Sequence, residues 1–156
     1  MNTTIIGLEV EASKKLTENL NELLANFQVY YQNLRGLHWN IKGRAFFELH
    51  VKFEEFYTDS QEKIDMVAER ILTLGGVPLH TFEDYTTLAK VPIGKNVTSD
   101  VEAVELVVTS IGELLKIERS ILELADKASD EGTNAMMSDF ISEQEKTIWM
   151  LQAWLA

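Results

Sequence analysis

Four segments of the sequence repeat apolar residues at intervals of three and four positions, and each segment continues for more than twenty residues. Such spacing lines up apolar side chains along one side of an α-helix, as in the seam of a helix bundle. Because an average helix has only about 11 or 12 residues, segments of this length favour an all-α bundle over an α/β fold. The expected helices cover residues 9–37, 46–74, 99–127 and 133–155.

Turn and capping signals separate the second helix from the third. Gly75 and Gly76, with Pro78 shortly after them, form a strong stop signal for the second helix. Ser99 and Glu102 have the spacing of a capping box at the start of the third helix. These signals predict that the two helices are separate elements.

One long connection joins these two helices. It covers residues 75–98, and we expect a short extra helix at residues 82–90 within it. A single long crossover is typical of ferritin-like four-helix bundles. Residues 1–156 are long enough for one domain with a substantial core, so we expect a single domain of this kind.

The charge balance narrows the classes of function. The chain carries a net charge of −11, from 25 Asp and Glu against 14 Lys and Arg. Nucleic-acid binding depends mainly on cations that neutralise phosphates, so this balance argues against a dedicated DNA-binding surface. Lys14 and Lys15 are an adjacent basic pair, but two charges are too few to change that interpretation.

Compartment signals favour the cytoplasm. The chain has no Cys, which excludes a disulfide framework and thiol chemistry. It contains no run of about 20 apolar residues, so we expect no membrane span. The N-terminal residues lack the basic start, the apolar core and the cleavage pattern of a secretory signal.

Five side chains in one stretch are the strongest candidates for chemistry: His38, His50, Glu54, Asp65 and Glu69. Two of the intervals between them are four residues, a spacing that places both members of a pair on the same side of a helix. Imidazole nitrogen with several carboxylate oxygens suits a divalent transition metal such as iron, manganese or zinc. The absence of thiolate argues against a structural zinc site.

Each of these residues also has an ordinary structural explanation. Asp65 and Glu69 could be solvated helix acids, and His38 beside Trp39 could cap a helix end. However, the candidate ligands of the second helix share one side, offset from its core stripe. The same side carries apolar residues that a solvated face would not favour, namely Phe47, Val51, Ala68 and Leu72. We therefore expect this second apolar face to be a subunit contact.

The distance between the two ligand pairs requires two chains. His50 and Asp65 are 15 positions apart, which is roughly 22 Å along a helix at about 1.5 Å per residue. Metal–ligand distances are about 2.0–2.2 Å, so one ion cannot reach both pairs within one subunit.

An antiparallel pairing of two copies of the second helix removes this difficulty. With a dyad between Asp59 and Ser60, every ligand and apolar residue of the second face lies opposite a counterpart. The opposed residues are His50 with Glu69, Glu54 with Asp65, Phe47 with Leu72, and Val51 with Ala68. His38 can join from the His50 side, which gives two equivalent sites per dimer.

Around these residues the sequence resembles the Dps family, ferritin-like DNA-binding proteins from starved cells. The matching motifs are LHWNIKGRAFFELHVKFEEFY, DMVAER and LTLGG, followed by ELADKASDEGTNAM and TIWMLQAWLA. The resemblance covers nearly the whole chain and implies a hollow dodecamer with ferroxidase sites at dimer interfaces. One subunit would supply His38, His50 and Glu54, and its mate Asp65 and Glu69. Family members often have Asp where Glu54 stands, so we expect an altered second iron position.

The resemblance implies oxidation of ferrous iron, preferably by hydrogen peroxide, and storage of ferric mineral that protects DNA from oxidative damage. Zinc or another divalent metal could occupy the same site. Trp39, next to the ligand His38, could donate an electron to a stray oxidant, or could simply be a packed aromatic at a helix end. The Glu-x-x-His pairs of an ordinary ferritin site are absent from the sequence.

An acidic cluster lies at the turn into the last helix, where the family lines its three-fold pores: Asp126, Asp130 and Glu131. The alternative role for these acids is N-capping and complementation of the helix dipole. Ala135 stands where relatives often continue the acidic pore. Acids that could help nucleate mineral, although solvation explains them better, are Glu55, Asp59 and Glu62.

Many family members bind DNA through a lysine-rich tail, and we expect no such binding here. Two other interpretations stay open. The chain could form a non-catalytic Dps-like shell that binds zinc or iron without turnover. It could also be a simple helical interaction protein whose acids are only a solvated face.

Overall fold

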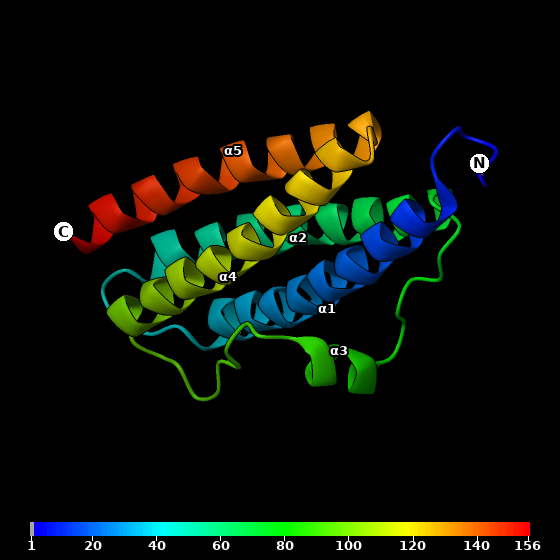
Figure 1. Ribbon diagram of the computed structural model, residues 1–156. Coiled ribbons are helices and arrows are strands. Elements are labelled where there is room, and N and C mark those ends of the chain that lie inside the picture. The colour runs from blue at the N-terminus through cyan, green and yellow to red at the C-terminus, as the bar shows by residue number, and fades with distance from the viewer. Residues whose placement is uncertain (1) are drawn as a thin grey trace.

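The computed structural model describes residues 2–156, and its helices confirm the expected all-α fold (Figure 1). In this part of the chain there are five helices and no strand. The helices are α1 (Val10–Asn40), α2 (Phe46–Thr73), α3 (Phe82–Leu88), α4 (Asp100–Lys127) and α5 (Glu131–Leu155). The four long helices form the bundle, and α3 is the short extra helix of the crossover.

The helices are arranged as two packed pairs. α1 packs against α2 and α4 against α5, and α1 also contacts α4 and α3. The crossover passes along the length of the bundle, so α2 and α4 run in the same direction (Figure 1). α3 lies beside α1 on the side away from α5. This arrangement leaves the side of α2 that carries Phe47 and Leu72 without a helix over it.

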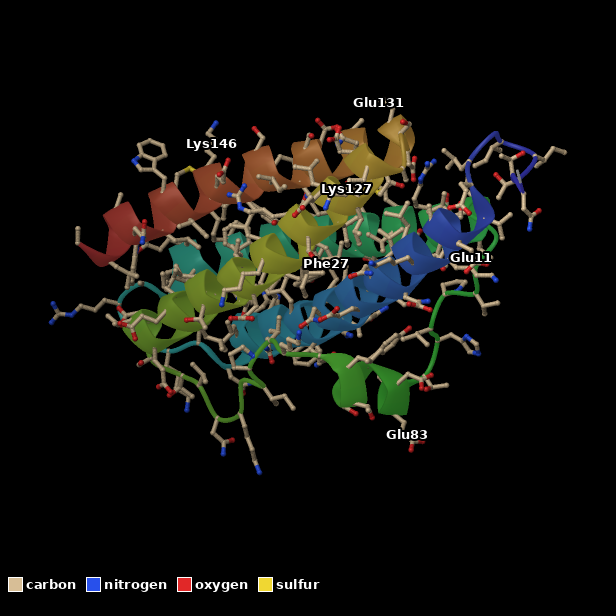
Figure 2. The ribbon with its side chains drawn as sticks, viewed as in Figure 1. Glu11, Phe27, Glu83, Lys127, Glu131 and Lys146 are labelled. Carbon is tan, nitrogen blue, oxygen red and sulfur yellow. The ribbon has the colours of Figure 1, made fainter. Side chains whose placement is uncertain are left out.

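The core consists of the apolar stripes of the four long helices. Phe27, Phe53 and Phe140 are buried on α1, α2 and α5, and Figure 2 shows Phe27 in the middle of the bundle. Phe27 and Phe140 meet edge to face, with ring centroids 5.9 Å apart. Such aromatic pairs contribute about 0.5–1.5 kcal/mol beyond the burial of their area. The packed core fixes the position of α2, and a binding site on the surface of α2 needs such a fixed position.

α1 continues three residues beyond its predicted end, to Asn40. The reason is that Ile41, just after the helix, is only 2% exposed and its N–H donates to the carbonyl oxygen of Leu37 at 3.0 Å. The buried side chain therefore keeps the last turn helical. As a result His38 and Trp39 lie on the last turn of α1 rather than in the following loop.

The other helix ends follow local capping chemistry. Gly75 has a φ of +87° and ends α2 as predicted. Ser99 caps α4 by accepting from the N–H of Glu102 at 3.3 Å. α5 begins two residues earlier than predicted because Asp130 accepts from the N–H of Thr133 at 3.0 Å.

Candidate metal centre

His38 at the end of α1 and His50 near the start of α2 lie face to face. Their rings are parallel to within 11°, with centroids 3.8 Å apart. Nδ1 of His38 is 2.6 Å from the backbone carbonyl oxygen of His50, and Nδ1 of His50 is 2.7 Å from that of His38. The loop between the helices is anchored by the buried side chains of Ile41 and Ala45. The pair is thus held by reciprocal hydrogen bonds on both sides.

These hydrogen bonds determine which nitrogen can bind a metal. A carbonyl oxygen only accepts, so each Nδ1 carries a hydrogen and each Nε2 of a neutral ring keeps a lone pair. Metal-binding histidines are commonly oriented in this way, by a bond from the other ring nitrogen to a carbonyl or carboxylate oxygen. Both imidazoles are half-buried and so remain within reach of an ion from solvent. His38 and His50 therefore form an oriented pair of nitrogen donors.

Two aromatic side chains support this pair. Phe46 stacks on His50 with ring centroids 4.9 Å apart, and the edge of Tyr57 meets His38 at 5.5 Å. The Tyr57 hydroxyl donates to Oε1 of Glu54 at 3.5 Å. Partial burial and then the negative charge of Glu54 raise the pKa of Tyr57, so this hydroxyl keeps its hydrogen.

The supporting role of Phe46 and Tyr57 was not predicted from the sequence. Phe46 and Tyr57 are only half-buried in the structure. Their spacing was the available signal, because Phe46 precedes His50 by four residues and Tyr57 follows Glu54 by three.

The three candidate acids of α2 face solvent in the single subunit: Glu54, Asp65 and Glu69 are all exposed. Among residues 2–156, no three His, Asp or Glu side chains are grouped closely enough to hold a metal ion. This is consistent with the distance argument, by which one subunit contains only parts of a site. The assembly of the five ligands across a dyad stays a prediction.

The second apolar face of α2 is open to solvent. Phe47 is 82% exposed, Val51 52% and Leu72 58%, while Ala68 is half-buried. Large apolar side chains gathered on one exposed face are typical of a surface that a partner covers. The ligands and these apolar residues therefore lie on a face suited to association with another chain.

Trp39 stands at the edge of this region. Its side chain is 58% exposed, and the guanidinium of Arg35 lies 4.9 Å from its ring centroid. A cation over an aromatic face is a favourable contact, but it leaves most of the indole accessible. A small oxidant can thus reach Trp39, whose role as an electron donor stays a prediction.

The acids at the turn between α4 and α5 divide into two kinds. Asp126 and Glu131 are exposed, and Figure 2 shows Glu131 at the outer end of α5. In contrast, the side chain of Asp130 is only 1% exposed. This side chain caps α5 and forms an ion pair with Arg70. A carboxylate that is already buried in one subunit cannot line a water-filled channel, so Asp130 has the capping role and is removed from the candidate pore.

Comparisons with known proteins agree with this fold. A family model described as the ferritin-like domain matches residues 17–156. A DNA protection during starvation protein from Porphyromonas gingivalis is 42% identical over 150 residues, which cover 96% of this chain and 94% of that protein.

Solved structures give the same result. One is a DPS protein from Vibrio cholerae O1, which is described as a member of a broad superfamily of ferritin-like diiron-carboxylate proteins. The match has a TM-score of 0.98 and 52% sequence identity, and it covers 100% of this chain and 98% of that chain. Another is Dps from Listeria innocua, in a structure soaked with 10 mM zinc. That match has a TM-score of 0.86 and 33% sequence identity, and it covers 90% of this chain and 95% of that chain.

A four-helix bundle with one long crossover, matched over most of its length by the ferritin-like domain, places this protein in the ferritin-like class. Within that class, the chain belongs to the Dps family. No helix among residues 2–156 combines the length and the apolar character that a bilayer crossing requires.

Proposed function

We propose that this protein is a ferroxidase that stores iron, and that it acts in the cytoplasm as a homo-oligomer with sites shared between subunits. The observation that carries the proposal is the oriented His38–His50 pair beside the exposed apolar face of α2. Glu54 would complete the donor set of one subunit. The partner subunit's Asp65 and the partner subunit's Glu69 would face it across the dyad.

Iron is the substrate of this site. Imidazole nitrogen and carboxylate oxygen together suit divalent iron. Because Fe(III) carries more charge than Fe(II), anionic oxygens stabilise the oxidised ion more strongly, and the carboxylates of this donor set therefore favour oxidation. Glu54 is longer than the Asp that is frequent in the family, and its hydrogen bond from Tyr57 would restrict where the extra length places the carboxylate.

Hydrogen peroxide is the oxidant that fits a paired site. Two ferrous ions give up one electron each and become ferric. Hydrogen peroxide takes up these two electrons and two protons, its O–O bond breaks, and two water molecules form. Because both electrons arrive from neighbouring ions, no hydroxyl radical is released. Trp39 would donate an electron to any single-electron oxidant that is not reduced by the two ferrous ions.

The ferric product would be stored as mineral inside a hollow dodecamer. The exposed Asp126 and Glu131 at the α4–α5 turn would give negative charge to an entry route for Fe(II). Ala135, at a position where relatives often have an acid, would weaken that funnel. DNA would be protected because iron and peroxide are consumed, and not because the protein coats it.

Stopped-flow absorbance tests the oxidation. Protein loaded with Fe(II) without oxygen is mixed with peroxide or with dissolved oxygen, and light scattering gives the size of the particle. We expect fast oxidation by peroxide with about two irons per peroxide, slower oxidation by oxygen, and a twelve-subunit particle.

The matched control is Glu48→Gln, an exposed acid of α2 outside the ligand set, which should oxidise iron normally. A particle that binds iron or zinc stoichiometrically but oxidises iron no faster than buffer would replace this proposal by the non-catalytic shell. A small particle that binds no metal would leave only the helical interaction protein.

A further inference from the structure

Tyr57 on α2 is held between two side chains of α1. Its ring meets His38 edge to face, with ring centroids 5.5 Å apart and planes at 78°. It meets Tyr31, which precedes His38 on α1, in the same way at 5.9 Å and 87°. α1 and α2 form one of the two packed pairs of the bundle. The seam between these two helices therefore fixes the position of the Tyr57 ring.

The hydroxyl of Tyr57 reaches a different ligand. It donates to Oε1 of Glu54 at 3.5 Å. Tyr57 follows Glu54 by three positions, a spacing that places both side chains on the same side of α2. Tyr57 thus contacts the nitrogen ligand His38 through its ring and the oxygen ligand Glu54 through its hydroxyl. It connects two candidate ligands that come from different helices.

The length of the Glu54 side chain makes this contact important. Glu54 is exposed in the single subunit, and Glu has one more rotatable bond than Asp. A metal ion that fixes a Glu carboxylate therefore removes more rotamer freedom than one that fixes an Asp carboxylate. A hydrogen bond that already restricts the carboxylate reduces this cost of binding.

We propose that Tyr57 is a positioning residue that adapts the shared site to a glutamate at position 54. Its hydroxyl holds the carboxylate of Glu54 on the side of His38 before a metal ion arrives, and so raises the affinity of the site for a divalent metal. An Asp at position 54 would be shorter by one carbon–carbon bond, about 1.5 Å, and would lie beyond the reach of the hydroxyl. This inference rests on the proposed function, because it requires Glu54 to be a ligand.

Titration with Co²⁺ tests the proposal without turnover. Co²⁺ binds the same types of donor as Fe²⁺, and its visible absorption depends on its ligands. Tyr57→Phe keeps the ring between Tyr31 and His38, so the bundle should fold, and it removes only the hydroxyl. Loss of a hydrogen bond to a metal ligand typically lowers metal affinity about 10–100-fold. We expect about a tenfold loss of Co²⁺ affinity, the lower end of that range, because the bond is 3.5 Å long.

A double-mutant cycle shows whether the hydroxyl acts through the carboxylate. In the Glu54→Asp background, Tyr57→Phe should change the Co²⁺ affinity less than about twofold. The visible spectrum of Co²⁺ bound to Tyr57→Phe should also shift toward that of Glu54→Ala, which has no carboxylate at this position. A general loss of packing would instead lower the affinity equally in both backgrounds.

Tyr85→Phe on α3 is the matched control. It also removes one hydroxyl, which donates to the carbonyl oxygen of Leu79 at 3.0 Å, but this bond lies in the crossover. Tyr85→Phe should bind Co²⁺ as tightly as the unmodified protein. The assembly carrying His50→Ala and Asp65→Ala gives the background binding of Co²⁺ to other surface acids.

The titration separates failure of this inference from failure of the proposed function. If the unmodified assembly binds no more Co²⁺ than the assembly carrying His50→Ala and Asp65→Ala, the proposed shared site is wrong, and the role of Tyr57 is wrong with it. If the unmodified assembly binds Co²⁺ above this background and Tyr57→Phe binds it equally tightly, only the role of Tyr57 is wrong. Equal losses of affinity with Glu54 and with Glu54→Asp also overturn that role.

Discussion

Arg70 and Asp130 form an ion pair of 2.5 Å in which the acid side chain is 1% exposed, and the pair joins the end of α2 to the start of α5. Nε of Arg70 also donates to Oγ1 of Thr133 at 2.9 Å. Gly132 lies directly against the guanidinium, because a Cβ at that position would come within 2.7 Å of it. Residues 130–133 therefore serve to fasten the α4–α5 turn to the helix that carries Glu69.

The first prediction is that Arg70→Ala destabilises the protein by about 3 kcal/mol or more, because it leaves the buried Asp130 carboxylate without a counter-charge. Arg119→Ala is the matched control, since it breaks an ion pair of similar length, 2.7 Å to Glu145, whose side chains are both about half exposed. Arg119→Ala should lower the free energy of unfolding by no more than about 1 kcal/mol. Thermal unfolding of the two variants side by side measures the difference, and equal losses would contradict the assigned role of Arg70.

The second prediction concerns pH and Glu118, a buried acid of α4. The usual pKa of this carboxyl is 4.5, and burial raises it to about 8 in the folded chain. Between these values the folded state holds a proton that the unfolded state releases, so the stability contributed by Glu118 falls as pH rises through this range. The slope is at most about 1.4 kcal/mol per pH unit.

Glu118→Gln cannot lose a proton and should remove this fall. Its melting temperature, relative to that of the unmodified protein, should therefore increase steadily from about pH 5 to about pH 8. Glu105→Gln, an exposed acid on the same helix, should show no such trend. A difference between Glu118→Gln and the unmodified protein that is independent of pH would mean that Glu118 is already ionised in the fold.

The fold was predictable because helix length and periodicity are local properties of the sequence. The end of α1 was not predictable in this way, because the apolar seam in the sequence ends at Leu37. The helix continues to Asn40 because tertiary contacts bury Ile41. The candidate ligands were recognised because spacing on one helix determines which side chains share a face. The stacking of His38 on His50 depends instead on how the loop between two helices closes.

The burial of Glu118 and Lys63 was missed for a different reason. Neither residue was singled out in the sequence, although each falls on an apolar stripe: Ile111, Leu114 and Ile121 on α4, and Val67 and Ile71 on α2. A charge within a helical apolar stripe is therefore a signal worth following. Asp130 was open to two interpretations because capping and pore lining require the same residue types at the same turn, and only its burial decides between them.

The third prediction tests the sharing of ligands between subunits. His50→Ala and Asp65→Ala should each abolish fast iron oxidation, because both would serve the same site from opposite chains. When the two variant proteins are dissociated and reassembled together, one of the two sites in each mixed dimer loses both ligands and the other keeps the full set. Fast oxidation should then return in part. Mass spectrometry verifies that the subunits have exchanged. If fast oxidation does not return after verified exchange, sharing across the dyad is ruled out.

The fourth prediction concerns the exposed face of α2. Phe47→Lys and Leu72→Lys should each prevent dimer formation, because each places a charge where an apolar side chain would be covered. Ile5→Lys is the control, since Ile5 is fully exposed and lies before α1, outside this face. Sedimentation velocity should show small particles for the first two variants and the full assembly for the third. Intact assemblies carrying Phe47→Lys would show that this face is not the subunit contact.

The fifth prediction is that the protein protects DNA without binding it tightly. The net charge of −11 repels phosphate, so a gel-shift experiment at neutral pH and low salt should show no stable complex. Nicking of plasmid DNA by ferrous iron and peroxide should nevertheless fall when the protein is present. The assembly carrying His50→Ala and Asp65→Ala should give no such protection, because coating of DNA would survive these changes whereas consumption of peroxide would not. A retarded band at neutral pH would refute the absence of binding, and equal protection by the altered assembly would refute the chemical mechanism.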